Sequence, residues 1–228
     1  MIKYASNAFL ATKITYINEL ANLCEKIDVN IQDISTGMGL DQRIGDRFLR
    51  AGPAYGGSCF PKDTRALIDT ANKFKTDLSV VKSVVKSNNN RKISLIQRIE
   101  KILNKKLKNK IITFLGVTFK PNTDDMREAA SIPMINYLNK KSCKIRYFDP
   151  SGEKNEFKKL KNVKYFKDIQ SACFKSDLII IHTEWNEFKL LNFKKLVKKR
   201  NFIIYDLRNI YSPSKMSNSK IKYYSIGR

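Results

Sequence analysis

Cys59 is the residue of this sequence best placed to do covalent chemistry. It lies in the run Gly56-Gly57-Ser58-Cys59-Phe60-Pro61-Lys62-Asp63, where the two glycines allow backbone conformations that other residues avoid. Pro61 and Asp63 predict a helix that begins just after the cysteine. A thiol beside a helix N-terminus and Lys62 is favoured as the nucleophilic thiolate. On spacing alone, an ordinary loop cysteine remains the competing interpretation.

Three helices are expected around this loop. Apolar residues recur at three- to five-residue steps over 2–26, which predicts a helix there. Further helices are predicted over 63–73 and 78–106. Between them, the glycines and prolines from Gly37 to Pro61 predict irregular backbone that carries functional residues. Because no capping residue precedes the first helix, we interpret the sequence as part of a longer chain.

After residue 109 short β-branched runs alternate with amphipathic stretches. This alternation predicts a parallel, doubly wound sheet, which binds its ligands beyond the carboxyl ends of the strands. We therefore expect an α/β protein with a helical domain over 1–108 and a Rossmann-like domain over 109–228. The predicted strands are 111–115, 144–148, 178–181 and 202–205, and the predicted helices lie near 131–141, 167–174 and 187–199.

Composition and cysteine usage describe a globular protein of a reducing compartment. The chain has 228 residues, of which 42% are hydrophobic. No apolar run approaches the roughly 20 residues of a membrane helix and no signal peptide is visible, so we expect no membrane partner. The four cysteines show no CxxC pair, which argues against a disulfide framework or a zinc site and favours the cytoplasm. No metal is expected.

The net charge of +23, from 44 Lys and Arg against 21 Asp and Glu, allows two interpretations. One is a nucleic-acid or acidic-surface partner. The other is lysine-rich residue usage on solvated faces. Because no RNA-binding motif, aromatic-interleaved basic strand or helix-turn-helix pattern is present, we expect solvated faces and no nucleic-acid partner.

Four motifs in register resemble the UDP-glucose 6-dehydrogenase family. The run 56–63 resembles its nucleophile motif, residues 2–11 its substrate-contacting helix, residues 39–45 the segment before the active-site loop, and residues 119–128 the loop after the first strand of its last domain. The resemblance covers essentially the whole chain. It implies a central dimerisation domain followed by a UDP-sugar-binding domain. Ser58-Cys59-Phe60 favours UDP-glucose, since the GDP-mannose relatives typically have Ser-Cys-Leu there.

The resemblance implies a two-step oxidation of UDP-glucose to UDP-glucuronate that consumes two NAD⁺. In that chemistry Cys59 attacks the aldehyde and later carries a thioester. Lys3 and Asn7 lie four residues apart, hence on one helical face, and would stabilise the oxyanion. Asp63 would help to position or activate water.

The resemblance also implies binding roles. Lys62 and Arg127 would contact NAD, and Arg43 would reach the substrate of a neighbouring subunit in a homodimer. The substrate would be bound by Lys3, Asn7, Arg43, Phe48, Leu49, Arg50, Ala51, Gly52, Tyr55, Gly56, Phe119, Lys120 and Arg208.

A complete enzyme of this family would also have an N-terminal NAD-binding domain with a GxGxxG fingerprint. The nearest match here, Gly37-Met38-Gly39-Leu40-Asp41-Gln42, lacks the third glycine and follows no predicted strand. The expectation is therefore an enzyme fragment that is inactive alone and is complemented by a separately encoded N-terminal half or is a gene remnant. A UDP-sugar-binding module without turnover and a sibling enzyme acting on GDP-mannose remain the alternatives.

Overall fold

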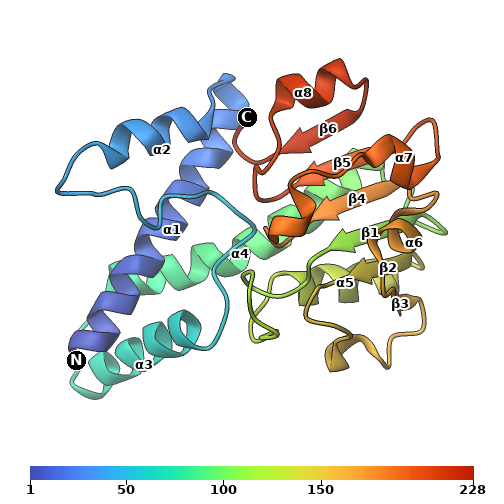
Figure 1. Ribbon diagram of the computed structural model, residues 1–228. Helices are drawn as coiled ribbons and strands as arrows, with labels where there is room; N and C mark the ends of the chain where they lie inside the picture. The colour runs from blue at the N-terminus through green and yellow to red at the C-terminus, as the bar shows by residue number, and fades with distance from the viewer. The chain divides into compact units, whose positions relative to one another are not determined.

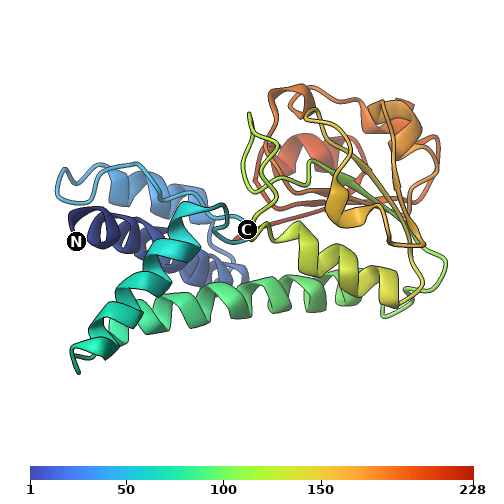
Figure 2. The ribbon, with the colours of Figure 1, turned by 90° about the horizontal axis from the view of Figure 1, so that it is seen from below.

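The computed structural model describes residues 1–228, which divide into two compact units. The first unit comprises Met1–Lys92 together with Ile226–Arg228, and the second comprises Ile93–Ser225. The division falls inside helix α4 (Ser79–Ile102) rather than near residue 108, where the sequence pattern changes. Figure 2 shows α4 as one continuous helix that belongs to both units.

The first unit is helical, as the apolar periodicity predicts. Helix α1 (Ile2–Ile27) packs against α2 (Ile31–Gly39) and α3 (Cys59–Lys73) (Figure 1). Asp28 ends α1 in the left-handed conformation, with φ 56°, and Asn30 caps α2 by accepting a hydrogen bond from the Gln32 amide. The side chains that α1 buries are Ala8, Ala11, Thr15, Ile17, Asn18, Ala21 and Cys24.

Two local expectations in this unit are wrong. Gly37-Met38-Gly39 is not irregular: it forms the last turn of α2, because glycine near a helix end carries little penalty. Helix α3 begins at Cys59 itself rather than after it, since Pro61 in the first turn lacks only an amide that would have no helical partner. The irregular backbone is therefore confined to residues 40–58.

The second unit is built on a six-stranded, fully parallel sheet in the order β3-β2-β1-β4-β5-β6. The predicted strands correspond to β1 (Ile111–Leu115), β2 (Lys144–Phe148), β4 (Leu178–Ile181) and β5 (Ile203–Asp206). The sequence did not predict β3 (Val163–Tyr165) or β6 (Lys222–Ser225). The prediction of an α/β protein with a Rossmann-like sheet is confirmed.

Short helices connect the strands. Helix α5 runs beside the last turns of α4 (Figure 2), where the Tyr137 hydroxyl donates to Glu100 Oε1 over 2.6 Å. The two central strands β1 and β4 are almost fully buried, as befits a parallel sheet covered on both faces. The remaining elements are α5 (Ser131–Lys140), η1 (Asn155–Phe157), α6 (Ile169–Cys173), η2 (Asn186–Phe188), α7 (Phe193–Val197) and α8 (Pro213–Asn218).

The last three residues belong to the first unit. The Ile31 amide donates to the Gly227 carbonyl and the Gly227 amide donates to Glu25 Oε1, each over 2.8 Å. Gly227 has φ +69°, and a Cβ there would lie 2.6 Å from Ile31 Cγ2. The site therefore requires glycine, and the C-terminal segment is anchored on α1 and α2.

Candidate active site and ligand-binding edge

Cys59 is the first residue of α3 and is exposed. Gly57, at φ +80°, turns the chain into the helix, and Ser58 Oγ lies 3.7 Å from Cys59 Sγ. Cys24, Cys143 and Cys173 are buried, and burial raises the pKa of Cys143 to about 11 and the pKa of Cys173 to about 12. Cys59 is thus the accessible thiol of the chain.

The structure brings three of the predicted catalytic and binding residues together on α1 and α3. Asn7 Nδ2 donates to Asp63 Oδ2 over 2.6 Å, and Lys62 Nζ lies 3.4 Å from Asp63 Oδ1. Cys59 and Asp63, four residues apart, share one face of α3, as Lys3 and Asn7 share one face of α1. Asp63 is fully buried, whereas Lys3 is exposed.

The Asp63 carboxyl is held ionised by its neighbours. Burial alone would raise its pKa, but hydrogen bonds from Asn7 and Lys62 and the positive charges of Lys62 and Lys3 hold the pKa below the ordinary value of 3.8. Asp63 therefore acts as an acceptor, not as an acid, at neutral pH.

This depressed pKa predicts an acid-sensitive packing of α3 on α1. A carboxyl whose pKa is lower in the folded state stabilises the fold above the unfolded-state value, near 3.8, and loses that contribution as the pH falls through the folded pKa. We expect the thermal midpoint of the native chain to fall more steeply below about pH 4 than that of Asp63→Asn. Parallel curves for the two proteins between pH 6 and 3 would contradict this assignment.

The loop before Cys59 is held by polar side chains buried on α1 and α4, which the sequence analysis missed. Asn88 Nδ2 donates to the Tyr55 carbonyl over 3.1 Å and Asn88 Oδ1 accepts from the Tyr55 amide over 2.9 Å. Arg91 Nε donates to the Gly52 carbonyl over 2.6 Å, and the Gly52 amide donates to Asn18 Oδ1 over 2.8 Å. Both backbone groups of Gly52 are thus engaged within the protein, so its contribution is to shape the loop.

An aromatic cluster lines the same loop. The Phe60 ring lies 6.0 Å from the Phe48 ring and 6.1 Å from the Tyr55 ring. Phe48 has φ +65°, and the following Leu49 is buried and accepts a hydrogen bond from Ser35 Oγ over 2.7 Å. Of the other residues expected to bind substrate here, Arg50 is exposed, whereas Ala51, Gly52 and Gly56 are buried.

Arg43 projects from a hydrogen-bonded turn. Its guanidinium pairs with Asp41, with Nη2 2.6 Å from Oδ2, and its side chain is 88% exposed. Lys13 Nζ on α1 donates to the Ile44 carbonyl over 2.8 Å and to the Gly45 carbonyl over 3.3 Å. Arg43 is therefore presented to the outside of this unit from a turn that α1 supports.

In the second unit, Arg208 ties together loops at the carboxyl edge of the sheet. Its Nε donates to the His182 carbonyl over 2.8 Å and lies 2.9 Å from Glu184 Oε2, and its Nη2 donates to the Phe119 carbonyl over 3.0 Å. Lys120 is exposed, with Nζ 5.5 Å from the Phe119 ring centroid. Arg208 thus shapes the loop that carries the predicted binding residues Phe119 and Lys120.

His182 lies at the same edge, immediately after β4. The ring is fully buried, its Nδ1 lies 3.1 Å from Thr183 Oγ1, and burial lowers the pKa of His182 to about 3. Gly116, after β1, has φ +73°, and a Cβ there would lie 2.6 Å from Thr183 Cβ. The ends of β1 and β4 are thus closely packed, and His182 is neutral at physiological pH.

The second unit lacks the features by which sheets of this strand order usually bind a dinucleotide. The turn after β1 has one glycine, and no helix starts until Ser131. The acidic residue after β2, Asp149, is fully buried and accepts hydrogen bonds from the Val117 and Ser151 amides, so it does not face a ribose. Arg127, expected to contact NAD, pairs with Asp125 through two 2.9 Å hydrogen bonds.

Comparison with known proteins defines the class. Residues 1–90 match the central domain of the UDP-glucose/GDP-mannose dehydrogenase family, and residues 113–213 match the UDP binding domain of the same family. The chain belongs to this family of nucleotide-sugar dehydrogenases.

Its similar relatives include named enzymes. The chain is 47% identical to UDP-glucose 6-dehydrogenase of Rickettsia typhi and 44% identical to that of Rhizobium meliloti, over 100% of this chain and 53% and 52% of the relatives. A UDP-glucose dehydrogenase structure from Pyrobaculum islandicum superposes with a TM-score of 0.85 at 32% identity, over 98% of this chain and 49% of that one. The chain therefore spans about half the length of the relatives it matches.

Proposed function

We propose that this chain carries the nucleophile and the UDP-sugar-binding domain of a UDP-glucose 6-dehydrogenase. The observation that supports this most directly is the exposed Cys59 at the start of α3, one turn before the buried Asp63 that holds Asn7. The 47% identity to a UDP-glucose 6-dehydrogenase points to UDP-glucose as the substrate.

The chain's own residues support a covalent route. The Cys59 thiolate adds to the C6 aldehyde of the sugar, so that a carbon–sulfur bond forms and the carbonyl electron pair moves to oxygen. Asn7 uses one amide hydrogen on Asp63, and a primary amide has a second hydrogen to donate to that oxyanion. Lys3 adds a positive charge from the same face of α1. In the last step water adds to the carbonyl carbon of the thioester and the carbon–sulfur bond breaks. This releases the sugar as a carboxylate and regenerates the Cys59 thiolate.

Oxidation of the sugar requires NAD as hydride acceptor, and we derive no step through it. These 228 residues contain no GxGxxG fingerprint, and the acidic residue after β2, Asp149, is fully buried and bound to backbone amides. We propose that a polypeptide of these residues alone produces no NADH and needs a nucleotide-binding half supplied with it or in trans. The unpaired thiols of all four cysteines support a reducing, cytoplasmic setting.

Calorimetric titration of the purified chain tests this proposal. UDP-glucose should bind, whereas GDP-mannose and NAD should not, and no NADH should form from UDP-glucose and NAD⁺. Preferential binding of GDP-mannose would instead favour an enzyme of the same family that oxidises GDP-mannose. Binding of UDP-glucose without activity, even beside a complementing nucleotide-binding half, would favour a binding module without turnover.

We also propose a homodimer formed through α1. Four exposed apolar residues on this helix, Ile2, Phe9, Tyr16 and Leu23, recur at intervals of seven and therefore form one stripe. Phe9 is 65% exposed and Tyr16 is 51% exposed. A second copy would cover this stripe and would place Arg43 of one subunit toward the substrate of the other.

The dimer predicts a clear effect of charge on the stripe. Phe9→Asp combined with Tyr16→Asp should convert the protein to monomers in sedimentation velocity at micromolar concentration, because a charge cannot be buried in an apolar contact without a partner. Phe74→Asp, a change at a residue that is 71% exposed outside the stripe, is the control and should leave the dimer intact. A double variant that remains dimeric would exclude α1 as the interface.

A further inference from the structure

The positive charge of the second unit is concentrated at one edge of its sheet. All six strands run parallel, so the segments that lead into them meet at the amino edge, opposite the arrowheads in Figure 1. These segments carry Lys105, Lys106, Lys108, Lys110, Lys141, Lys159, Lys161, Lys175, Lys198, Lys199, Arg200 and Lys220. They contain one acidic residue, Asp177, which pairs with Lys199 over 2.7 Å and with Lys110 over 3.3 Å.

At the opposite, carboxyl edge of the sheet, acidic residues outnumber basic ones. The segments that follow β1 to β5 contain more acidic than basic residues, and most of the acidic ones lie after β1, β2 and β4. The acidic residues are Asp124, Asp125, Glu128, Asp149, Glu153, Asp168, Glu184 and Glu187, and the basic ones are Lys120, Arg127, Lys154, Lys167, Lys189 and Arg208. The unit is therefore polarised along its strands, which charge spread evenly over solvated faces would not produce.

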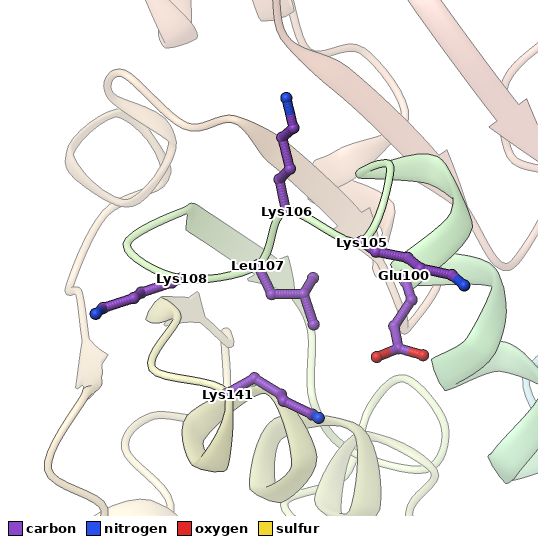
Figure 3. Close-up of a pocket in the computed structure, with 6 residues that line it drawn as sticks. All are labelled: Glu100, Lys105, Lys106, Leu107, Lys108 and Lys141. Carbon is purple, nitrogen blue, oxygen red and sulfur yellow. The ribbon is translucent and has the colours of Figure 1, made fainter.

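The basic edge is hollowed at two places. One hollow of about 440 Å³ is lined by Glu100, Lys105, Lys106, Leu107, Lys108 and Lys141. Figure 3 shows Lys106 and Lys108 pointing away from Glu100, and both lysines are exposed. The other hollow, of about 480 Å³, is lined mainly by Lys194, Lys199, Arg200 and Lys220 with Phe202 and Ile221. Both hollows lie on the side away from the carboxyl edge, where the family's UDP is expected to bind.

The residue types indicate what kind of anion this edge suits. Eleven of its twelve cations are lysines, whose ammonium groups attract negative charge without the bidentate geometry that arginine offers to individual phosphates or bases. Phe174, 40% exposed, is the one large apolar side chain strongly exposed among these segments, whereas single-stranded nucleic acids bind on successive aromatic platforms. Six strands about 4.8 Å apart spread the charge over roughly 25 Å.

Although the sequence led us to expect no membrane partner, we propose that the amino edge of the sheet is an electrostatic docking surface for an anionic lipid bilayer. A broad row of lysines on short loops gains attraction from a negatively charged membrane surface without inserting into it. None of the helices has the length and hydropathy of a membrane span. Docking through this edge leaves the carboxyl edge of the same sheet directed away from the lipid.

Vesicle sedimentation tests the proposal with the purified 228-residue protein. The protein should sediment with phosphatidylcholine vesicles that contain phosphatidylglycerol and not with pure phosphatidylcholine, and raising the salt well above about 0.1 M should release it. The variant Lys105→Glu/Lys106→Glu/Lys108→Glu should bind at least about tenfold more weakly, because each lysine near an anionic surface contributes substantially to binding.

A variant with the same change in net charge distinguishes the effect of the amino edge from the effect of net charge alone. Lys167, Lys189 and Lys215 are exposed lysines of the same unit that lie outside the amino edge, so Lys167→Glu/Lys189→Glu/Lys215→Glu should retain most of the vesicle binding. Equal losses in the two triple variants would overturn the proposal, as would binding that does not depend on phosphatidylglycerol. Tighter binding to duplex DNA or RNA than to the vesicles at equal salt would overturn it in favour of a nucleic-acid surface.

Discussion

Iodoacetamide applied to the native chain should alkylate Cys59 and leave the other three cysteines unmodified. Cys59 is exposed at the first residue of α3, whereas Cys24, Cys143 and Cys173 are buried. Alkylation of a buried thiol requires local opening of the fold, so we expect rates at least about a hundredfold slower there. For Cys143 and Cys173, whose pKa values are raised by burial to about 11 and about 12, the small thiolate fraction slows the reaction further.

Intact-mass measurements over time would show one added carbamidomethyl group per chain. Cys59→Ser should take up none over the same period, and the control Cys173→Ser should still take up one. If Cys59 is the nucleophile of a UDP-glucose site, UDP-glucose should slow its alkylation and GDP-mannose should not. Rapid labelling of Cys59→Ser, or of a second thiol in the native chain, would contradict the assignment.

The second large effect is expected on stability. Replacing Arg91 with methionine should lower the free energy of unfolding of the helical unit by about 3 kcal/mol, because buried acceptors are left unpaired. Arg91 is 5% exposed and donates to the Gly52 carbonyl, the Asn18 carbonyl and Asn22 Oδ1. Urea unfolding followed by circular dichroism, which is dominated by helices, would measure the change.

Two further variants separate Arg91 from general charge effects. Arg47→Met removes the same charge from an exposed position of the same unit and should change stability by less than about 0.5 kcal/mol. Arg91→Lys should recover little of the stability that Arg91→Met loses, because one ammonium group cannot reproduce the several hydrogen bonds of a guanidinium. Because Gly52 lies in the loop that leads to Cys59, the Arg91 variant should also alter the alkylation rate of Cys59. An Arg91→Met protein as stable as the native one would show that the network is dispensable.

The sequence predicted the features that depend on regular periodicity. Buried β-branched runs such as Leu178–Ile181 predict central parallel strands, and these are the strands observed. The long apolar periodicity of α1 and α4 located both helices within a few residues. Cys59 was singled out as a candidate by the glycines, proline and charged pair around it, and the family resemblance of the run 56–63 favoured it over an ordinary loop cysteine.

The features that sequence reasoning missed depend on tertiary contacts. Edge strand β6 (Lys222–Ser225) is polar and only half-buried, so its pattern does not differ from that of a loop. Asn18, Asn88 and Arg91 were not singled out from the sequence, although they are buried and hold the loop before Cys59. One signal was available: the run Asn88-Asn89-Asn90 is costly within a helix and indicates a role other than helix formation.

The anchoring of Ile226–Arg228 on α1 and α2 has a thermodynamic consequence for the sheet. Residues 93–225 enter from α4 and leave into that anchored segment, so the first unit holds both ends of the intervening chain. When the sheet unfolds while the helical unit stays folded, the released chain is a closed loop with less conformational entropy than a free tail. The C-terminal contact thus acts as a non-covalent cross-link that penalises independent opening of the sheet and couples the unfolding of the two units, up to the strength of its own few bonds.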